Sequence, residues 1–197
     1  LSAFMIALCI LWLVPTYSAE PLDAGAVLLA KVAKSQVRGF STRDFGREPY
    51  KGARSALVKE ADAPAMLAEL RRQLPIGLIA FIGTSNSLVD PPAKGVELVV
   101  ASGKDQFEIL RIAASDAANY DMTTEDLIKE LRSWDREFGI SITQAETDTI
   151  ILELKSLPLD LTSFATRVYK FCPDIVDQGV GDIPSLVREI RKSKKVF

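Results

Sequence analysis

Residues 123–145 read TTEDLIKELRSWDREFGISITQA and carry the clearest structural signal in the chain. Thr123 and Asp126 have the spacing of a capping box, with Asp126 where Glu is usual, so a helix is predicted to begin here. The apolar residues that follow recur at helical spacing: Leu127, Ile128, Leu131, Trp134 and Phe138. Gly139 is the predicted stop, and residues 140–145 then alternate as a strand.

The rest of the C-terminal part continues to alternate between helices and strands. Residues 149–154 predict a further strand, and Asp160 is the predicted N-cap of a helix that ends at Pro173. Asp182 is the predicted N-cap of the last helix, after which residues 196–197 open another strand.

Two apolar runs upstream, residues 96–101 and 107–112, flank a Ser-Gly-Lys-Asp turn and predict a hairpin. From residue 107 onward the expected order is strand, helix, strand, strand, helix, helix, strand. This order predicts an α+β fold with a ferredoxin-like split βαβ core and one added helix, preceded by a helix and further strands.

The N-terminal part contains a predicted helix over residues 22–37 and a Gly- and Pro-punctuated segment, 38–54, interpreted as a linker. A helix from Ala63, with Asp62 as its N-cap, and a strand over residues 76–82 follow. We therefore expect a signal peptide at 1–19, a helix and linker at 20–54, and a single α+β domain at 55–197.

The first 19 residues are uncharged, and residues 3–14 are continuously apolar. A helix of that run rises only about 18 Å, which is short of a ~30 Å hydrocarbon core, so a cleaved secretory signal is favoured. The sequence thus predicts a periplasmic or secreted protein with no stable membrane anchor after cleavage. The alternative is a protein tethered by an uncleaved N-terminal segment.

The chain has 24 Lys and Arg against 26 Asp and Glu, which gives a net charge of −2 and no electrostatic reason to bind nucleic acid. Cleavage would remove Cys9 and leave Cys172 without a disulfide partner. Cys172 lies on the predicted apolar stripe at the C-terminal end of its helix, so we interpret it as structural rather than reactive.

The sequence contains no His. This excludes Ser-His-Asp and Cys-His catalysis and the common zinc sites. Carboxylates, Lys, Tyr, hydroxyls and an oxygen-ligated metal remain, and no residue is assigned a catalytic role.

The segment DIVDQGVGD, residues 174–182, is the most site-like in the chain. One interpretation places Asp174, Asp177 and Asp182 around a hard cation such as Ca²⁺ or Mg²⁺. The interpretation we favour requires no cofactor: Asp182 caps the last helix and the glycines form a turn. A ligand pocket here would use Tyr120, Asp121 and Trp134 together with Asp174, Asp177, Gln178 and Gly179.

Three stretches carry a resemblance to a known family: FCPDIVDQGVGD at residues 171–182, ANYDMTTEDLIKELRSWDREFGI at 118–140, and more weakly VELVVASGKDQFEILRIA at 96–113. The chain from about residue 63 to 197 resembles the bacterial family catalogued as domain of unknown function 4253. The family has no established activity, so the resemblance implies only that residues 172–179 shape a shared structural feature or pocket.

These observations predict an exported, non-catalytic binding or interaction domain with a protein or small-molecule partner. The alternative is a carboxylate- or metal-dependent enzyme that uses the loop from Asp174 to Asp182.

Overall fold

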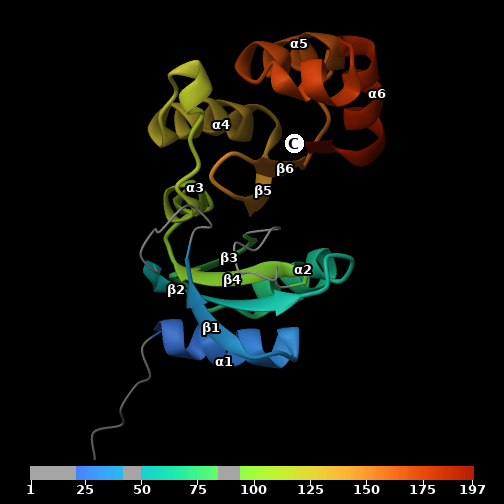
Figure 1. The fold of residues 1–197 in the computed structure, drawn as a ribbon. Helices are drawn as coiled ribbons and strands as arrows, with labels where there is room; N and C mark the ends of the chain where they lie inside the picture. The colour runs from blue at the N-terminus through green and yellow to red at the C-terminus, as the bar shows by residue number, and fades with distance from the viewer. Residues whose placement is uncertain (1–20, 42–49, 84–93) are drawn as a thin grey trace, which may run out of the picture.

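The computed structural model describes residues 21–41, 50–83 and 94–197, so the predicted leader at 1–19 lies outside the described residues. The fold is α+β, as predicted, and is built on a seven-stranded mixed sheet in the order β1-β2-β4-β3-β5-β6-β7 (Figure 1). None of the helices in these ranges has the length and apolar character to cross a membrane.

The first half of the sheet comes from the N-terminal part of the chain. Its elements are α1 (Pro21–Ala33), β1 (Val37–Phe40), β2 (Tyr50–Val58), α2 (Ala63–Gln73), β3 (Leu78–Ile82) and β4 (Val96–Ser102). All strand pairs within this half are antiparallel. Helices α1 and α2 share one apolar cluster with β2, β3 and β4, so α1 is integral to the sheet's packing.

The second half follows along the chain. Its elements are α3 (Glu108–Ala113), η1 (Ala118–Tyr120), α4 (Thr124–Phe138), β5 (Ile140–Ala145), β6 (Ile150–Leu154), α5 (Leu161–Phe171), η2 (Ile175–Val180), α6 (Ile183–Ser193) and β7 (Lys195–Val196). Figure 1 shows α4, α5 and α6 packed over β5 and β6, on the side away from α1.

The local signals in the second half are confirmed. Thr123 and Asp126 form the predicted capping box, and Gly139 ends α4 with φ +65°, a conformation that glycine adopts without strain. Asp160 and Asp182 each accept a hydrogen bond from the backbone amide three residues on, as N-caps do.

The prediction of a strand at residues 107–112 is wrong, because Glu108–Ala113 form α3. Glu108 and Arg111 share the exposed face of this turn and form an ion pair at 3.1 Å, while the apolar residues face the core. A helix in place of that strand removes the first strand of the predicted split βαβ unit. The ferredoxin-like arrangement is therefore not confirmed.

Two further predictions are corrected. The segment interpreted as a linker contains β1 and the beginning of β2, which pair with each other at one edge of the sheet. Only part of β1 is buried, so its sequence lacks the apolar alternation that identifies a strand. Asp62 precedes α2 in helical conformation and makes no side-chain cap.

The two halves of the sheet meet where β3 and β5 run parallel. Within the described residues this pair has one matched position, Ile82 with Gln144. Elsewhere the β3-facing edge of β5 is bonded by side chains. The Gln106 amide donates to the Ile140 carbonyl at 3.2 Å and accepts from the Ile142 amide at 2.9 Å, as a neighbouring strand would.

Arg71, at the end of α2, bridges the same junction. Its guanidinium donates to the carbonyls of Ala80 on β3 and Ile142 on β5, and to the hydroxyl of Ser141. Desolvation lowers the pKa of Arg71, and Glu153 opposes that shift. Asp135 accepts a hydrogen bond from the Ile140 amide at 2.8 Å. We call this junction of β3 and β5 the seam, because side chains rather than strand pairing supply most of the hydrogen bonds to this edge of β5.

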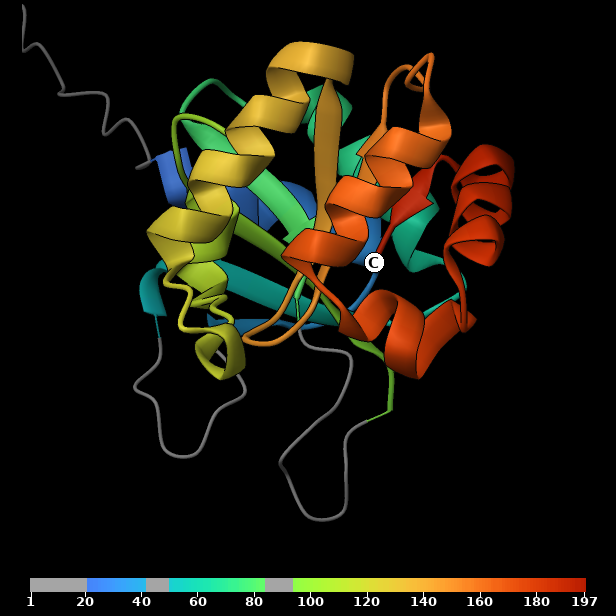
Figure 2. The same cartoon turned by 90° about the horizontal axis from the view of Figure 1, so that it is seen from above.

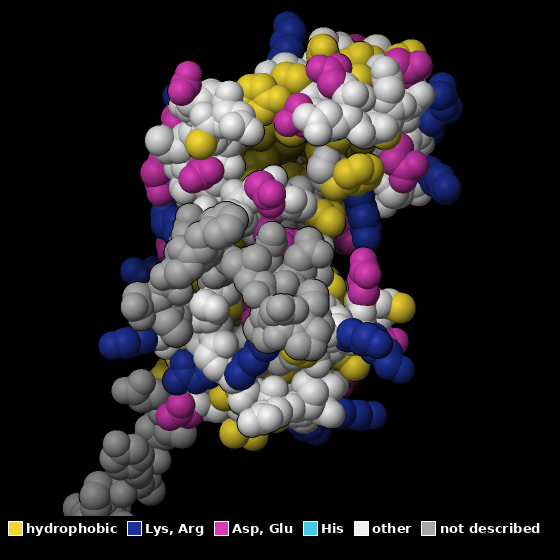
Figure 3. Space-filling view, viewed as in Figure 1, with side chains coloured by type: hydrophobic (Ala, Val, Ile, Leu, Met, Phe, Trp, Pro, Cys, Tyr) yellow, Lys and Arg dark blue, Asp and Glu magenta, His cyan; other side chains and the backbone are white. Residues whose placement is uncertain are grey.

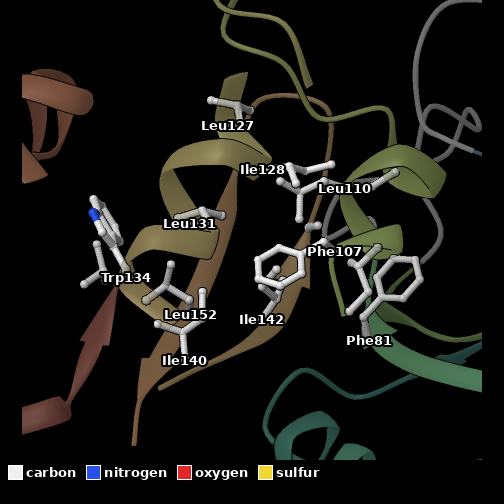
Figure 4. Close-up of a cluster of buried hydrophobic side chains, with 14 of the residues drawn as sticks. Phe81, Phe107, Leu110, Leu127, Ile128, Leu131, Trp134, Ile140, Ile142 and Leu152 are labelled. Carbon is white, nitrogen blue, oxygen red and sulfur yellow. The ribbon is translucent and has the colours of Figure 1, made fainter. Parts of the chain in front are cut away.

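The main hydrophobic core lies between α4 and the second half of the sheet (Figure 4). Leu131 and Trp134 point from α4 toward Ile140, Ile142 and Leu152, all of which are buried. The core continues to Phe81, Phe107 and Leu110, so this cluster spans both halves of the sheet, while α1 and α2 pack in a second cluster.

Candidate functional site

The helical turn η1 presents Tyr120 on a braced loop. The residues that flank it, Ala117 and Met122, exchange backbone hydrogen bonds at 3.1 and 3.2 Å and close the loop. The Asp116 amide donates to the Thr147 carbonyl at 3.0 Å, which ties the loop to the turn between β5 and β6. Tyr120 is 39% exposed on this fixed base.

The segment η2 is one turn of π-helix between α5 and α6. Its closing bond runs from the Gly181 amide to the Val176 carbonyl at 2.8 Å. Ile175 and Val176 anchor the turn in the core. Short π-helical turns are rare and often occur at functional sites, because they displace side chains from regular helical positions.

Asp174 lies at the N-terminus of η2 in helical conformation and makes no side-chain cap. Its carboxylate instead lies near the Tyr120 hydroxyl, although the two residues are far apart in sequence. Hydrogen bonding with the Asp174 side chain is the main cause that raises the pKa of Tyr120 to about 12, with further contributions from desolvation and from the charges of Asp174, Cys172 and Asp177. Tyr120 therefore stays protonated near neutral pH and acts as a hydrogen-bond donor.

The structure thus brings together four of the residues singled out in the sequence. Asp174, Cys172 and Asp177 all lie close enough to Tyr120 to raise its pKa, and Asp174 has the largest effect. Asp121, Gln178 and Gly179 are exposed on the same two turns. Figure 2 shows these turns, yellow and orange-red, along one edge of the molecule beside the turn between β5 and β6.

Asp182 has a different role from that of Asp174. It accepts from the Ser185 amide at 2.6 Å, and its hydrogen bonds with Ser185 lower its pKa. In the described ranges, no three Asp, Glu, His or Cys side chains are gathered as a metal site requires. Asp174, Asp177 and Asp182 therefore do not form the trio considered for Ca²⁺ or Mg²⁺.

Trp134 belongs to the core rather than to a surface pocket. It is 1% exposed, packs edge-on against Phe164 and Phe171, and donates from its indole nitrogen to Glu130 at 2.6 Å. Cys172 is half-buried at the C-terminal end of α5, beyond the buried stripe. Trp134 contacts Phe171, which precedes Cys172 in the chain, and shares the core cluster with Ile175 and Val176 of η2.

The surface around these turns is hollowed. In Figure 3 apolar side chains line a recess between the side of the molecule formed by η1 and α4 and the side formed by η2 and α6. Acidic side chains lie around it. The site therefore offers an apolar floor, an aromatic ring and negative charge.

Sequence reasoning missed a second polar group, at the edge of the first half of the sheet. Glu97 is 5% exposed in β4 and is bonded to Arg38 and Ser55. A signal for it was available, because Glu97 is the single charged residue in the apolar run 96–101.

The comparisons with known proteins agree with the resemblance seen in the sequence. Residues 97–197 match the model of a family described as a domain of unknown function (DUF4253). The match begins in β4, later than the expected residue 63, and extends to the last residue. Neither the curated proteins nor the solved structures gave a match. The family match covers about half of the chain, and the chain belongs to the DUF4253 family.

Proposed function

We propose that this protein is a non-catalytic binding domain, whose partner presents a positively charged group to the surface formed by Tyr120, Asp174 and Asp177. The observation that carries the proposal is the nearness of Tyr120 to Asp174, which raises the pKa of Tyr120 to about 12 and places a half-exposed aromatic ring near carboxylates. Both residues lie on turns whose backbones are fixed by their own hydrogen bonds. A preorganised surface of this kind loses little conformational freedom on binding.

The chemistry of these residues favours a cation. Asp174 and Asp177 provide negative charge, and the exposed Asp121 adds to it. The face of a tyrosine ring attracts an ammonium or guanidinium group within about 6 Å of its centre. A tyrosine hydroxyl is protonated near neutral pH, and the raised pKa of Tyr120 makes it still harder to deprotonate, so it remains a hydrogen-bond donor.

The test uses two cationic probes, the diamine cadaverine and arginine amide. Pentanediol serves as the uncharged analogue of cadaverine. Chemical-shift changes in a ¹H–¹⁵N spectrum should be saturable for the cations and confined to residues 118–122 and 172–180. Tyr120→Phe and Asp174→Asn should weaken binding about fivefold or more, because each removes one polar group of the pair.

Asp23→Asn is the matched control, since Asp23 is an exposed carboxylate on α1 at the far end of the molecule. It makes the same change in net charge as Asp174→Asn and should leave binding unchanged. Equal weakening by the two Asp variants would reduce the effect to bulk charge and overturn the proposal. So would the absence of saturable shifts at these turns.

We also propose that the protein is exported, with residues 1–19 as a cleaved signal. The support is the uncharged, apolar character and short length of that segment. Expression of the full chain followed by cell fractionation and N-terminal sequencing tests this. A mature protein that starts near residue 19 or 20 outside the cytoplasm agrees with the proposal, whereas an intact N-terminus in the cytoplasm contradicts it.

A further inference from the structure

Glu97 is a buried carboxylate in an otherwise apolar strand. It is 5% exposed, between the buried residues Val96 and Leu98 of β4. Glu97 faces the same side of the sheet as Val99, and Phe40 of β1 lies beside it. Charged side chains are rarely buried to this extent unless both carboxylate oxygens have partners.

The two carboxylate oxygens of Glu97 differ in their hydrogen bonding. Oε1 accepts from the Arg38 guanidinium at 2.7 Å and from the Ser55 hydroxyl at 3.0 Å. Oε2 is fully buried and has no hydrogen-bond partner, and it is the sole buried side-chain oxygen or nitrogen of the described residues in this condition. An acceptor left in this state costs stability, and such a group in a folded protein calls for an explanation, for example a functional role or a bound water or ion.

Glu97 lies beside the carboxyl end of β3. Gly83 follows the carboxyl end of β3, and its amide donates to the Glu97 carbonyl at 2.8 Å. Glycine at position 83 leaves a narrow space beside Oε2, since a Cβ there would lie 3.0 Å from Val99, 3.2 Å from Phe40 and 3.5 Å from Oε2. β3 is parallel to β5, and the carboxyl ends of parallel strands are the usual ligand-binding edge of such sheets.

The charges of this cluster define what would bind. Glu97 and Arg38 together are neutral; among the described residues Oε2 has no partner, and the Arg38 guanidinium has only its Nη2 bond to Glu97. The Arg38 side chain is 42% exposed, so solvent reaches the guanidinium that borders the buried carboxylate. A ligand that satisfies both carries a donor next to an acceptor, and a zwitterion with no net charge matches this neutral pair.

We propose that Glu97, Arg38 and Ser55 form a binding site for a small zwitterion of the α-amino acid class. The ammonium group donates to Oε2 of Glu97, and the carboxylate accepts from the free N–H groups of Arg38. Phe40 and Val99 provide apolar walls beside the carboxylate. This site is separate from the surface at Tyr120 and Asp174 and does not depend on the function proposed for it.

The test titrates the protein with glycine and the other common L-amino acids, using calorimetry and ¹H–¹⁵N spectra. Ethanolamine carries the ammonium alone and acetate the carboxylate alone. At least one amino acid should give saturable shifts at the amides of Gly39, Ser55, Gly83 and Glu97 below about 10 mM. Glu97→Gln and Arg38→Met should each weaken that binding about tenfold or more.

Arg54→Met is the matched control, because Arg54 lies on β2 and donates to backbone carbonyls rather than to Glu97. It should leave the affinity unchanged. Arg38 is at the exposed edge strand, so Arg38→Met keeps the test decisive if Glu97→Gln does not fold. The proposal is overturned if no amino acid binds at these amides, if ethanolamine binds equally well, or if both site variants retain full affinity.

Discussion

Replacement of Arg71 by Met should weaken the attachment between the two halves of the sheet and so lower the free energy of unfolding. The helix α2, which carries this residue, should remain intact. Met keeps most of the aliphatic stem but cannot donate to the carbonyls of Ala80 and Ile142, whose residues are 2% and 0% exposed. A buried acceptor that loses its donor costs about 1–3 kcal/mol, so two of them cost about 2–6 kcal/mol. Release of a partly desolvated cation offsets some of this, and we expect a net loss of about 2–4 kcal/mol.

The assay is urea unfolding followed by circular dichroism, with the free energy of unfolding obtained by linear extrapolation. With a slope of about 2 kcal/mol/M, the expected loss lowers the midpoint by about 1–2 M. Arg72→Met is the matched control, because Arg72 is exposed in the same last turn of α2 and loses the same favourable interaction with the helix dipole. It should change stability by about 0.5 kcal/mol or less.

Arg71→Lys should fall between wild type and Arg71→Met, since one ammonium cannot reproduce the planar fork that reaches both strands. Gln106→Leu tests the same junction of β3 and β5 in a second way. The amide hydrogen of Ile142 should exchange with solvent faster in this variant, because its acceptor is the Gln106 side chain. The reasoning fails if Arg71→Met and Arg72→Met have the same stability within about 0.5 kcal/mol.

Four further results are expected. Asp174→Asn should return the pKa of Tyr120 from about 12 toward its ordinary value of 10.0, measured as the ultraviolet tyrosinate transition that Tyr120→Phe removes. Hydrogen bonds from Ser163 lower the pKa of Asp160, so its contribution to stability is present above its ordinary value of 3.8 and is lost as the pH falls through the folded value. Asp160→Ala should therefore lower the melting temperature at pH 7 and flatten its decline in acid. Gly139→Ala should destabilise by more than about 1 kcal/mol in urea unfolding, because φ is +65° at this position. Trp134→Ala should cost about 3–5 kcal/mol in the same assay, as expected for a fully buried aromatic residue.

The sequence was most informative where a structure depends on residues close together in the chain. The capping box at Thr123 and the caps at Asp160 and Asp182 need only three or four residues, and all three are found as expected. The error at residues 107–112 was also local and avoidable. Glu108 and Arg111 are three apart, which places them on one face of a helix but on opposite faces of a strand.

Other features depend on partners that lie far away in the sequence. β1 is recognisable as a strand only beside β2, and the roles of Arg71 and Gln106 exist only once β3 and β5 are neighbours. Tyr120 and Asp174 were both identified as candidates, but their nearness arises only once the fold brings together segments that are far apart in sequence. Glu97 stood out as a charge within an apolar run, whereas its pairing with Arg38 required the sheet order.

The point at which the family match begins has a practical consequence. Residue 97 is the second residue of β4, and both neighbours of that strand, β2 and β3, are encoded upstream. A protein expressed from residue 97 onward would carry an almost wholly apolar strand with both edges bare, which is a template for self-association. Recombinant work on this chain should therefore retain the segment that begins with α1, even though the recognisable family signature starts some 75 residues later (97 − 21 = 76).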